Sequence, residues 1–224
     1  MTARSRAAAR YVDAAPRLLD VNWRRASFCA LDLETTGLDT SSDEIVSFAA
    51  VPVEAGRVRM AGTCSHFVRP RQAIPGSSIR IHGIRPIDVR DAPPLGDVIE
   101  ELLEAMTGRI LLVHVDWVER GFLAGPLHDL GIKLQEPVLD TARLARACMQ
   151  DVAAESLYAV SRRLGLPGYG VHEALGDALT TAQVFLALAS RLEASGVGTV
   201  AQLSRVGSAR GVRGRLARLR RSSV

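Results

Sequence analysis

After a leader of about 26 residues, the chain has apolar runs of strand length and then longer stretches of helical character. Three strand-like runs come first, at residues 28–33, 45–53 and 58–68. Short polar segments separate them, so we predict a three-stranded antiparallel meander. Residues 70–94 follow, and their five prolines predict a loop.

The second part of the chain predicts helices that alternate with short strands. In residues 95–106 apolar side chains recur three and four positions apart, which is the spacing of one buried helix face, and residues 174–192 are rich in alanine, a strong helix former. The helices are expected at residues 95–106, 118–130, 141–149, 155–164 and 174–192. The second is expected to be interrupted near Gly125 and Pro126. Buried strands are expected at residues 110–115 and 138–140. This order predicts an α/β fold, with a mixed sheet that has helices on its faces.

Length favours a single domain with tails. The chain has 224 residues, which is the ordinary size of one domain with short extensions. Residues 1–26 are expected to form a leader or a short helix packed on the body, residues 27–195 the main domain, and residues 196–224 a basic tail. No internal repeat divides the sequence further.

Composition places the chain among globular proteins. Apolar residues make up 47% and charged residues 23% of it, far from the composition of disordered chains. No apolar stretch approaches the roughly 20 residues of a membrane helix, and the arginine-rich start lacks the apolar segment of a secretory signal. Cys29, Cys64 and Cys148 are widely spaced without a Cys-x-x-Cys pattern, so the sequence indicates neither a disulfide framework nor a zinc site. We expect a reduced, cytoplasmic protein without a membrane segment.

Positive charge is concentrated at the C-terminal end. Residues 205–224 hold seven arginines and no acidic residue, whereas the rest of the chain has 21 basic and 24 acidic side chains, a net charge of about −3. Attraction to phosphate would therefore come from this tail and from local patches rather than from the whole surface. The tail either binds nucleic acid or acidic partners or is a solvated extension.

The most informative residues are two acids at the end of the first predicted strand. Asp32 and Glu34 are two positions apart, so on a strand both side chains point to the same face. Two buried like charges have no structural use, whereas divalent cations bind such pairs of carboxylates. A solvated strand edge is the other interpretation of an isolated Asp-x-Glu.

A second motif lies far downstream, where His172 precedes Asp177 by five residues. Together with the segment Asp32-Leu33-Glu34-Thr35-Thr36-Gly37-Leu38, it resembles the motifs of the DEDD exonuclease superfamily, specifically of its histidine-containing branch. That branch includes the proofreading epsilon subunit of bacterial DNA polymerase III. The resemblance covers roughly residues 27–190. Its further landmarks, in the family's order, are Ile81-His82-Gly83-Ile84, Phe122-Leu123 and Leu139-Asp140-Thr141.

The resemblance implies a ribonuclease H-like fold and a 3′–5′ exonuclease that hydrolyses phosphodiester bonds at DNA 3′ ends and releases nucleoside monophosphates. In-line hydrolysis needs charge neutralisation on both sides of phosphorus, which two Mg²⁺ or Mn²⁺ ions about 3.5–4 Å apart would supply. Asp32, Glu34 and Asp177 are the expected direct ligands, and the resemblance implies that Asp32 bridges both ions. It also implies that His172 is the general base, for which a capping or surface histidine is the other interpretation.

The third acid of the family's pattern is ambiguous in this chain. The family has His-Asn-x-x-Phe-Asp-x-x-Phe-Leu where residues 114–123 stand here. Glu119 occupies the position of the Asp, and Val115 that of the Asn. The resemblance implies that this acid often acts through a metal-bound water, a role that tolerates a longer side chain. Asp116 is the rival, three positions earlier on the same helix face, although the register of the Phe-Leu pair favours Glu119. If both are solvated helix charges, the enzyme is impaired.

Other residues near the acids are candidates for substrate binding. Those expected to handle the terminal nucleotide are Thr35, Thr36, Gly37 and Leu38. Leu38 would wedge against the last base, although a simple strand-ending turn explains the segment equally. His114 is expected either to contact the substrate backbone or to be a packed core histidine.

The substrate and partners rest on the proofreading analogy. It implies single-stranded or frayed DNA as the substrate and a DNA polymerase subunit as a candidate partner. Short RNA is the alternative substrate, because discrimination depends on contacts to the 2′-OH. A degenerate nuclease fold that serves as a nucleic-acid-binding scaffold is the alternative function, and the departure at Glu119 is its only support.

Overall fold

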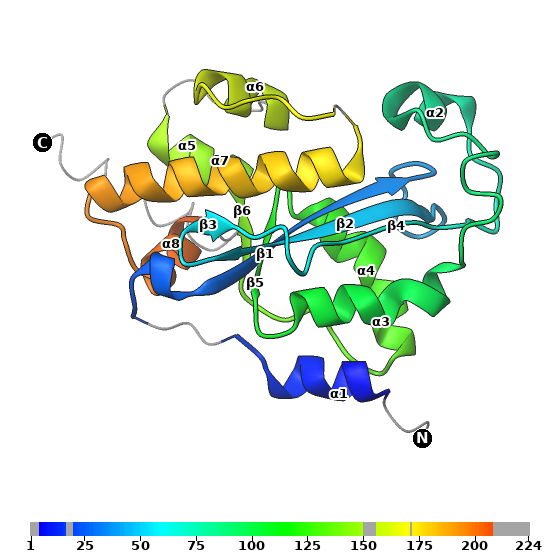
Figure 1. Cartoon of the computed structure of the whole chain (residues 1–224), viewed down its shortest axis with the longest axis horizontal. Helices are drawn as coiled ribbons and strands as arrows, with labels where there is room; N and C mark the ends of the chain where they lie inside the picture. The colour runs from blue at the N-terminus through cyan, green and yellow to red at the C-terminus, as the bar shows by residue number, and fades with distance from the viewer. Residues whose placement is uncertain (1–4, 17–19, 150–155, 171, 208–224) are drawn as a thin grey trace, which may run out of the picture.

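A mixed β-sheet runs through the middle of the molecule (Figure 1). The computed structural model describes residues 5–16, 20–149, 156–170 and 172–207. Within these residues the sheet has six strands: β1 Ser27–Thr35, β2 Ile45–Glu54, β3 Arg57–Val58, β4 Cys64–Phe67, β5 Ile110–Val113 and β6 Val138–Asp140. Their order is β3-β2-β1-β5-β6, and β4 also pairs with β2. β2 is antiparallel to its neighbours, whereas β1, β5 and β6 run parallel.

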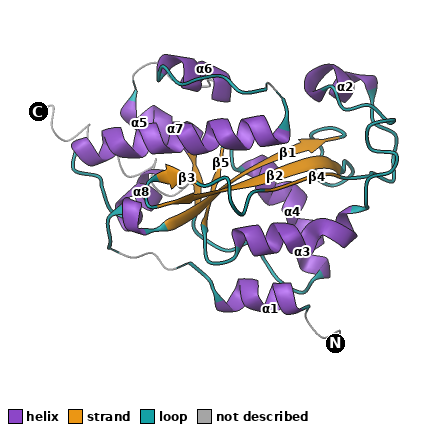
Figure 2. Cartoon of the chain, viewed as in Figure 1, coloured by secondary structure: helices purple, strands orange, loops and turns teal. Residues whose placement is uncertain are grey.

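Helices cover both faces of the sheet (Figure 2). In the described part of the chain they are α1 Arg6–Asp13, α2 Gly76–His82, α3 Leu95–Met106, α4 Trp117–Asp129, α5 Thr141–Cys148, α6 Leu157–Arg163, α7 Ala174–Ala194 and α8 Val200–Gly207. A short 3₁₀ turn, Trp23–Arg25, leads into β1. α7 lies along one face of the sheet near α5 and α6, and α3 lies on the opposite face beside α1 (Figure 1).

Successive side chains of β1 enter two different cores, because side chains alternate across a strand. Phe28 packs against Phe185 of α7, with ring centroids 4.7 Å apart. Leu31 points to the other face and belongs to the core built with α3 and α4. Asp32 follows Ala30, a residue of the α7 core, by two positions and therefore lies on the α7 face.

The α/β fold expected from the sequence is confirmed, but its third strand is divided. The single strand predicted over residues 58–68 is wrong, because β3 ends at Val58 and β4 begins at Cys64. Between them Gly62 has a φ of +86°, a left-handed conformation that favours glycine and ends an extended run. Both short strands pair with β2, so the antiparallel edge of the sheet is kept.

The predicted loop over residues 70–94 contains a helix, α2. The helix ends at Gly83, whose left-handed backbone (φ +73°) lets its N–H donate to the carbonyl of Ile79 at 2.8 Å. With only seven residues after Pro75, α2 is too short for an apolar period to reveal it in the sequence.

Two other predicted boundaries also differ. α4 continues through Gly125 and Pro126, so the predicted interruption is wrong. Leu127 stays buried on its core face, and a proline removes only one donor from the helix ladder. β5 ends at Val113, two residues earlier than predicted, because Val115 adopts a left-handed conformation with a φ of +72°.

Helices on either side of the predicted main domain pack onto it. Tyr11 of α1 is buried, and its hydroxyl oxygen accepts the backbone N–H of Gln135 at 2.9 Å. Leu203 of α8 is buried in the same core as α5 and α7. The boundaries predicted after residues 26 and 195 stay predictions.

Residues 208–224, which carry most of the arginine-rich tail, lie outside the described residues. Among the helices that the structure does describe, none is both long and apolar enough to span a membrane.

Candidate active site

β1 brings two carboxylates to the same face of the sheet. Asp32 is paired with Ala49 of β2, and Glu34 with Ser47. Directly opposed residues of an antiparallel pair share a face, and Ala49 belongs to the core of α7. Both carboxylates therefore point to the side of α7, as the Asp-x-Glu spacing predicts.

The start of α7 brings the second motif to these acids. Asp177 lies in the first turn of α7 and is 6% exposed, and Glu34 is 8% exposed. A carboxylate oxygen of each and a ring nitrogen of His172 lie within 4.8 Å of one another. Residues that are far apart in the sequence thus form one cluster, with the imidazole on its exposed side.

Tyr158 of α6 connects the two halves of the downstream motif. Its hydroxyl donates to the Asp177 carboxylate and lies 3.0 Å from the carbonyl oxygen of Gly170. The backbone N–H of His172 donates to the same hydroxyl at 3.2 Å. Sequence reasoning missed this tyrosine, because no motif includes it and only the packing of α6 on α7 places it here.

Glu119 reaches the cluster from the first turn of α4. It is 3% exposed, and its Oε2 atom is buried without a hydrogen-bond partner. Burial raises its pKa to about 8, with smaller contributions from Asp140 and Asp116. Its charge in turn raises the pKa of Asp32, so it belongs to the same electrostatic cluster. A buried carboxylate oxygen without a partner is an available ligand.

The partners of Asp116 set it apart from Glu119. Arg143 donates to its two oxygens at 2.9 and 3.1 Å, and Arg120 Nε donates to Oδ2 at 3.0 Å. Two guanidinium groups therefore neutralise Asp116, and one of them holds it in a bidentate pair. This arrangement favours Glu119 as the third acid.

The electrostatics of the cluster favour a bound cation. Burial and, after it, the neighbouring Glu34 and Asp177 raise the pKa of Asp32 well above its ordinary range. Burial and the charge of Asp177 raise the pKa of Glu34 to about 8. Without positive charge, these carboxylates cannot all ionise together. A divalent cation removes this penalty, and carboxylate oxygens are the ligands that Mg²⁺ and Mn²⁺ prefer.

Polar groups of the loop after β1 form hydrogen bonds within the protein. Thr36 is buried, and its hydroxyl donates to Asp43 at 2.9 Å and accepts from Gln72 at 2.7 Å. A Cβ on Gly37 would come within 2.3 Å of the Asp43 carboxylate, which explains the glycine. Thr36 and Gly37 thus hold the loop together.

The other candidates for substrate binding differ in solvent exposure and in whether their polar atoms already have partners. Leu38 is 66% exposed and available to a ligand. Thr35 is buried and its hydroxyl donates to the carbonyl of Gly37 at 2.5 Å. His114 Nδ1 lies 2.9 Å from the Thr141 hydroxyl. That hydroxyl donates its single hydrogen to a backbone carbonyl at 2.9 Å, so the imidazole Nδ1–H is the donor in this pair.

The family of the chain follows from comparison with known proteins. The family model described as "Exonuclease" matches residues 29–185. The chain belongs to this exonuclease family. Exonuclease domains of the family depend on divalent metal ions, in agreement with the carboxylate cluster.

Relatives of this exonuclease include parts of larger proteins. The chain is 36% identical over 179 residues to a DNA polymerase III subunit epsilon-like protein of Rhodobacter capsulatus, covering 78% of the chain and 25% of that protein. It is 29% identical over 179 residues to a DNA polymerase III PolC-type protein of Caldanaerobacter subterraneus, covering 80% of the chain and 13% of that protein. The chain therefore spans a quarter or less of the length of these relatives.

A solved structure of similar size supports the same family. Exonuclease X in complex with 5′ overhanging duplex DNA superposes with a TM-score of 0.62 at 26% identity, covering 81% of this chain and 99% of that one. The predicted ribonuclease H-like architecture and exonuclease family are confirmed. Membership of the histidine-containing branch stays a prediction.

Proposed function

We propose that this exonuclease removes nucleotides from the 3′ end of DNA by two-metal hydrolysis and releases nucleoside monophosphates. One observation carries the proposal, the convergence of Glu34, Asp177 and His172 within 4.8 Å. Asp32 and Glu119 add their charges to this cluster. The proposal also rests on the exonuclease family. The names of its similar members refer to a DNA polymerase III subunit and to an exonuclease bound to DNA.

The residues of the cluster would have distinct roles. Asp32, Glu34 and Asp177 would hold the cations, Mg²⁺ or Mn²⁺, and Glu119 would support them from the α4 side. When bound, the two cations supply positive charge that stabilises the attacking and leaving oxygens of an in-line displacement.

Proton transfer would fall to His172. Its side chain is exposed beside the buried acids, so the imidazole can accept a proton from the attacking water and release it to solvent. Tyr158 contacts both the Asp177 carboxylate and the backbone of His172. We assign it the role of holding a metal ligand and the base in a fixed relation.

The substrate that the proposal favours is single-stranded or frayed DNA. A structural neighbour was solved with 5′ overhanging duplex DNA, which supports DNA as the substrate. Two relatives are polymerase III proteins by name, and the preference for a single-stranded or frayed 3′ end rests on the proofreading analogy. Short RNA is the second candidate. Proteins distinguish RNA from DNA by contacts to the 2′-OH, and neither the sequence nor the site identifies a residue for that contact. We extend the proposal to a DNA polymerase subunit as the partner, which co-purification from the native cell would test.

The test of function uses labelled oligonucleotides. Matched DNA and RNA single strands carrying a 5′ or a 3′ label are digested with Mg²⁺ or Mn²⁺, with and without EDTA. A 3′–5′ exonuclease shortens the 5′-labelled strand stepwise and releases the 3′ label as a mononucleotide at once. EDTA should stop both reactions.

Two variants make this test specific to the site. Asp32→Asn should abolish hydrolysis and leave the chain folded, because it removes a carboxylate that its neighbours repel. Asp129→Asn, at an exposed position on α4, is the matched control and should retain full activity. Hydrolysis by the Asp32 variant at the wild-type rate would exclude the proposed site. Nucleic-acid binding without any hydrolysis by the wild type would favour the scaffold function instead.

A further inference from the structure

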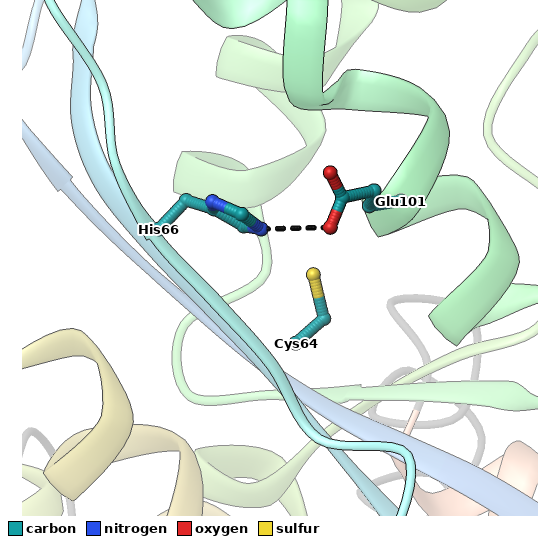
Figure 3. Close-up of side chains that lie close together, drawn as sticks. All are labelled: Cys64, His66 and Glu101. Atoms are coloured by element: carbon teal, nitrogen blue, oxygen red, sulfur yellow. Dashed lines mark hydrogen bonds and ion pairs between the residues drawn. The ribbon is translucent and has the colours of Figure 1, made fainter. Parts of the chain in front are cut away.

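A second group of metal-ligating side chains lies between β4 and α3 (Figure 3). Cys64 and His66 are two positions apart on β4, so they point to the same face of the strand. Glu101 of α3 completes the group. The sulfur, a ring nitrogen and a carboxylate oxygen of the three residues lie within 4.8 Å of one another.

This group is on the opposite face of the sheet from the candidate active site. His66 is paired with Phe48 of β2, and Phe48 belongs to the core of α3. Asp32, by contrast, is paired with Ala49, which belongs to the core of α7. The two groups share no residue, so each would bind its metal ion independently of the other.

We propose that Cys64, His66 and Glu101 bind Zn²⁺. Thiolate, imidazole and carboxylate are the ligands that zinc takes in proteins, whereas Mg²⁺ prefers oxygen ligands alone. A sulfur and a nitrogen donor therefore select a borderline-soft metal, unlike the all-carboxylate cluster of the active site.

The geometry suits a tetrahedral ion. Zinc bonds of about 2.0–2.1 Å to nitrogen and oxygen place those two atoms roughly 3.3 Å apart in a tetrahedron. His66 Nε2 and Glu101 Oε2 are 3.0 Å apart and joined by a hydrogen bond. The ion would replace this bond after small side-chain movements. The two side chains are 28% and 59% exposed, so water completes the coordination.

The surroundings hold the ligands of β4 in place. The ring of His66 packs against that of Phe48, with centroids 5.5 Å apart, and the Ser47 hydroxyl donates to the His66 backbone carbonyl at 3.1 Å. β4 pairs only with β2 among the described strands. A zinc ion would therefore tie an edge strand to the helix that covers it.

The test uses the metal-free full chain and two probes, Co²⁺ and Zn²⁺. A thiolate ligand gives bound Co²⁺ an intense charge-transfer absorption in the near ultraviolet, which the carboxylates of the active site cannot give. We expect this band in the wild type and its displacement by Zn²⁺. Zn²⁺ at about 100 times its Kd should also raise Tm by about 5 °C or more.

Variants assign the band to this site. Replacing a residue that only supports a metal ligand costs roughly 10- to 100-fold in affinity. Cys64→Ser and His66→Gln remove ligands, so each should weaken Zn²⁺ binding by more than that. Cys64→Ser should also lose the absorption band. Cys148→Ser, a change of another partly buried cysteine on α5, should keep it, as should Asp177→Asn. Absence of the band in the wild type, or its persistence in Cys64→Ser, would overturn the proposal. Neither result bears on nuclease activity, so the two proposals fail separately.

Discussion

At the scale of single residues, the partners of two acids at the start of α4, Asp116 just before the helix and Glu119 in its first turn, decide which of them is available to a cation. Glu119 keeps a buried oxygen without a hydrogen-bond partner, whereas Asp116 is held by Arg120 and Arg143. The sequence leaves both open, because three positions on a helix share a face. The register of the Phe122-Leu123 pair favours Glu119, and the position of α5, which supplies Arg143 to Asp116, supports that choice.

This difference gives a prediction about two amide variants. Glu119→Gln should lower kcat about 10- to 100-fold, the cost of removing a group that supports metal ligands. Asp116→Asn should keep kcat within a few-fold but lower the free energy of unfolding by about 1–3 kcal/mol, because it removes the closer of the two carboxylates that pair with the mostly buried Arg143 and leaves only Asp140 at 3.6 Å. Single-turnover kinetics and urea unfolding measure the two effects. The reverse pattern, with activity lost only in the Asp116 variant, would move the third acid to that position.

The site could be predicted from the sequence wherever the pattern is local. Asp32 and Glu34 were identified from a strand spacing of two, and the structure places both on one face. Tyr158 was not identified, because its contact with Asp177 depends on how α6 packs on α7. The sequence likewise presents Cys64 as an isolated thiol, because Glu101 comes from a helix that begins 31 residues later.

At the scale of elements, the sequence predicts the long segments and misses the short ones. Continuous apolar runs predict β1 and β2, an apolar stripe at helical spacing predicts α3, and an alanine-rich, helix-forming composition predicts α7. The break between β3 and β4 depends on the backbone of Gly62, and α2 has too few residues to show a helical stripe. The boundaries of these short elements therefore depend on local backbone conformation, which composition does not reveal.

The start of α7 gives a prediction that separates activity from stability. A Cβ on Gly176 would come within 2.5 Å of the carbonyl oxygen of Gly170, so Gly176→Ala should displace the segment that carries His172. Misplacing a catalytic group by about 1 Å costs up to about 100-fold, and we expect kcat to fall at least about tenfold. The free energy of unfolding should fall by no more than about 2 kcal/mol, because strain of about 1–3 kcal/mol is partly offset by the helix preference for alanine, about 1 kcal/mol.

A matched control exists in α4. A Cβ on Gly125 meets no atom within 4 Å, so Gly125→Ala should gain about 1 kcal/mol of stability and keep full activity. Thermal unfolding and initial rates on a labelled strand measure both variants. If Gly176→Ala hydrolyses DNA as fast as Gly125→Ala, the downstream segment does not position the base.

At the scale of the whole molecule, the clustered acids couple stability to pH and to metal. The pKa values of Glu34 and Glu119 are about 8 in the folded chain, against an ordinary value of 4.5. Folding therefore favours their protonated forms, and that stabilisation is complete below about pH 4.5 and lost as pH rises through 8. Carboxylates in ion pairs act in the opposite direction, but Asp88, whose pKa Arg85 lowers to about 2, titrates below this range.

We therefore predict that the EDTA-treated protein loses stability between about pH 5 and pH 8. Added Mn²⁺ should restore more stability at pH 8 than at pH 5, because ionised carboxylates bind it and protonated ones do not. Chemical unfolding across this range, with and without Mn²⁺, measures the effect. Glu119→Gln should show a shallower decline. A wild-type protein that becomes more stable toward pH 8 without metal would contradict the charge cluster.

The pairing of β2 has a consequence for how insertions and deletions act on this chain. Phe48 backs the imidazole of one group of ligands, and the next residue, Ala49, stands beside Asp32 of the other. A shift of one position would turn every side chain of the strand to the wrong face. Loss of a single codon inside this strand would therefore disturb both proposed metal-binding groups in one step, although no proposed ligand of either group comes from it.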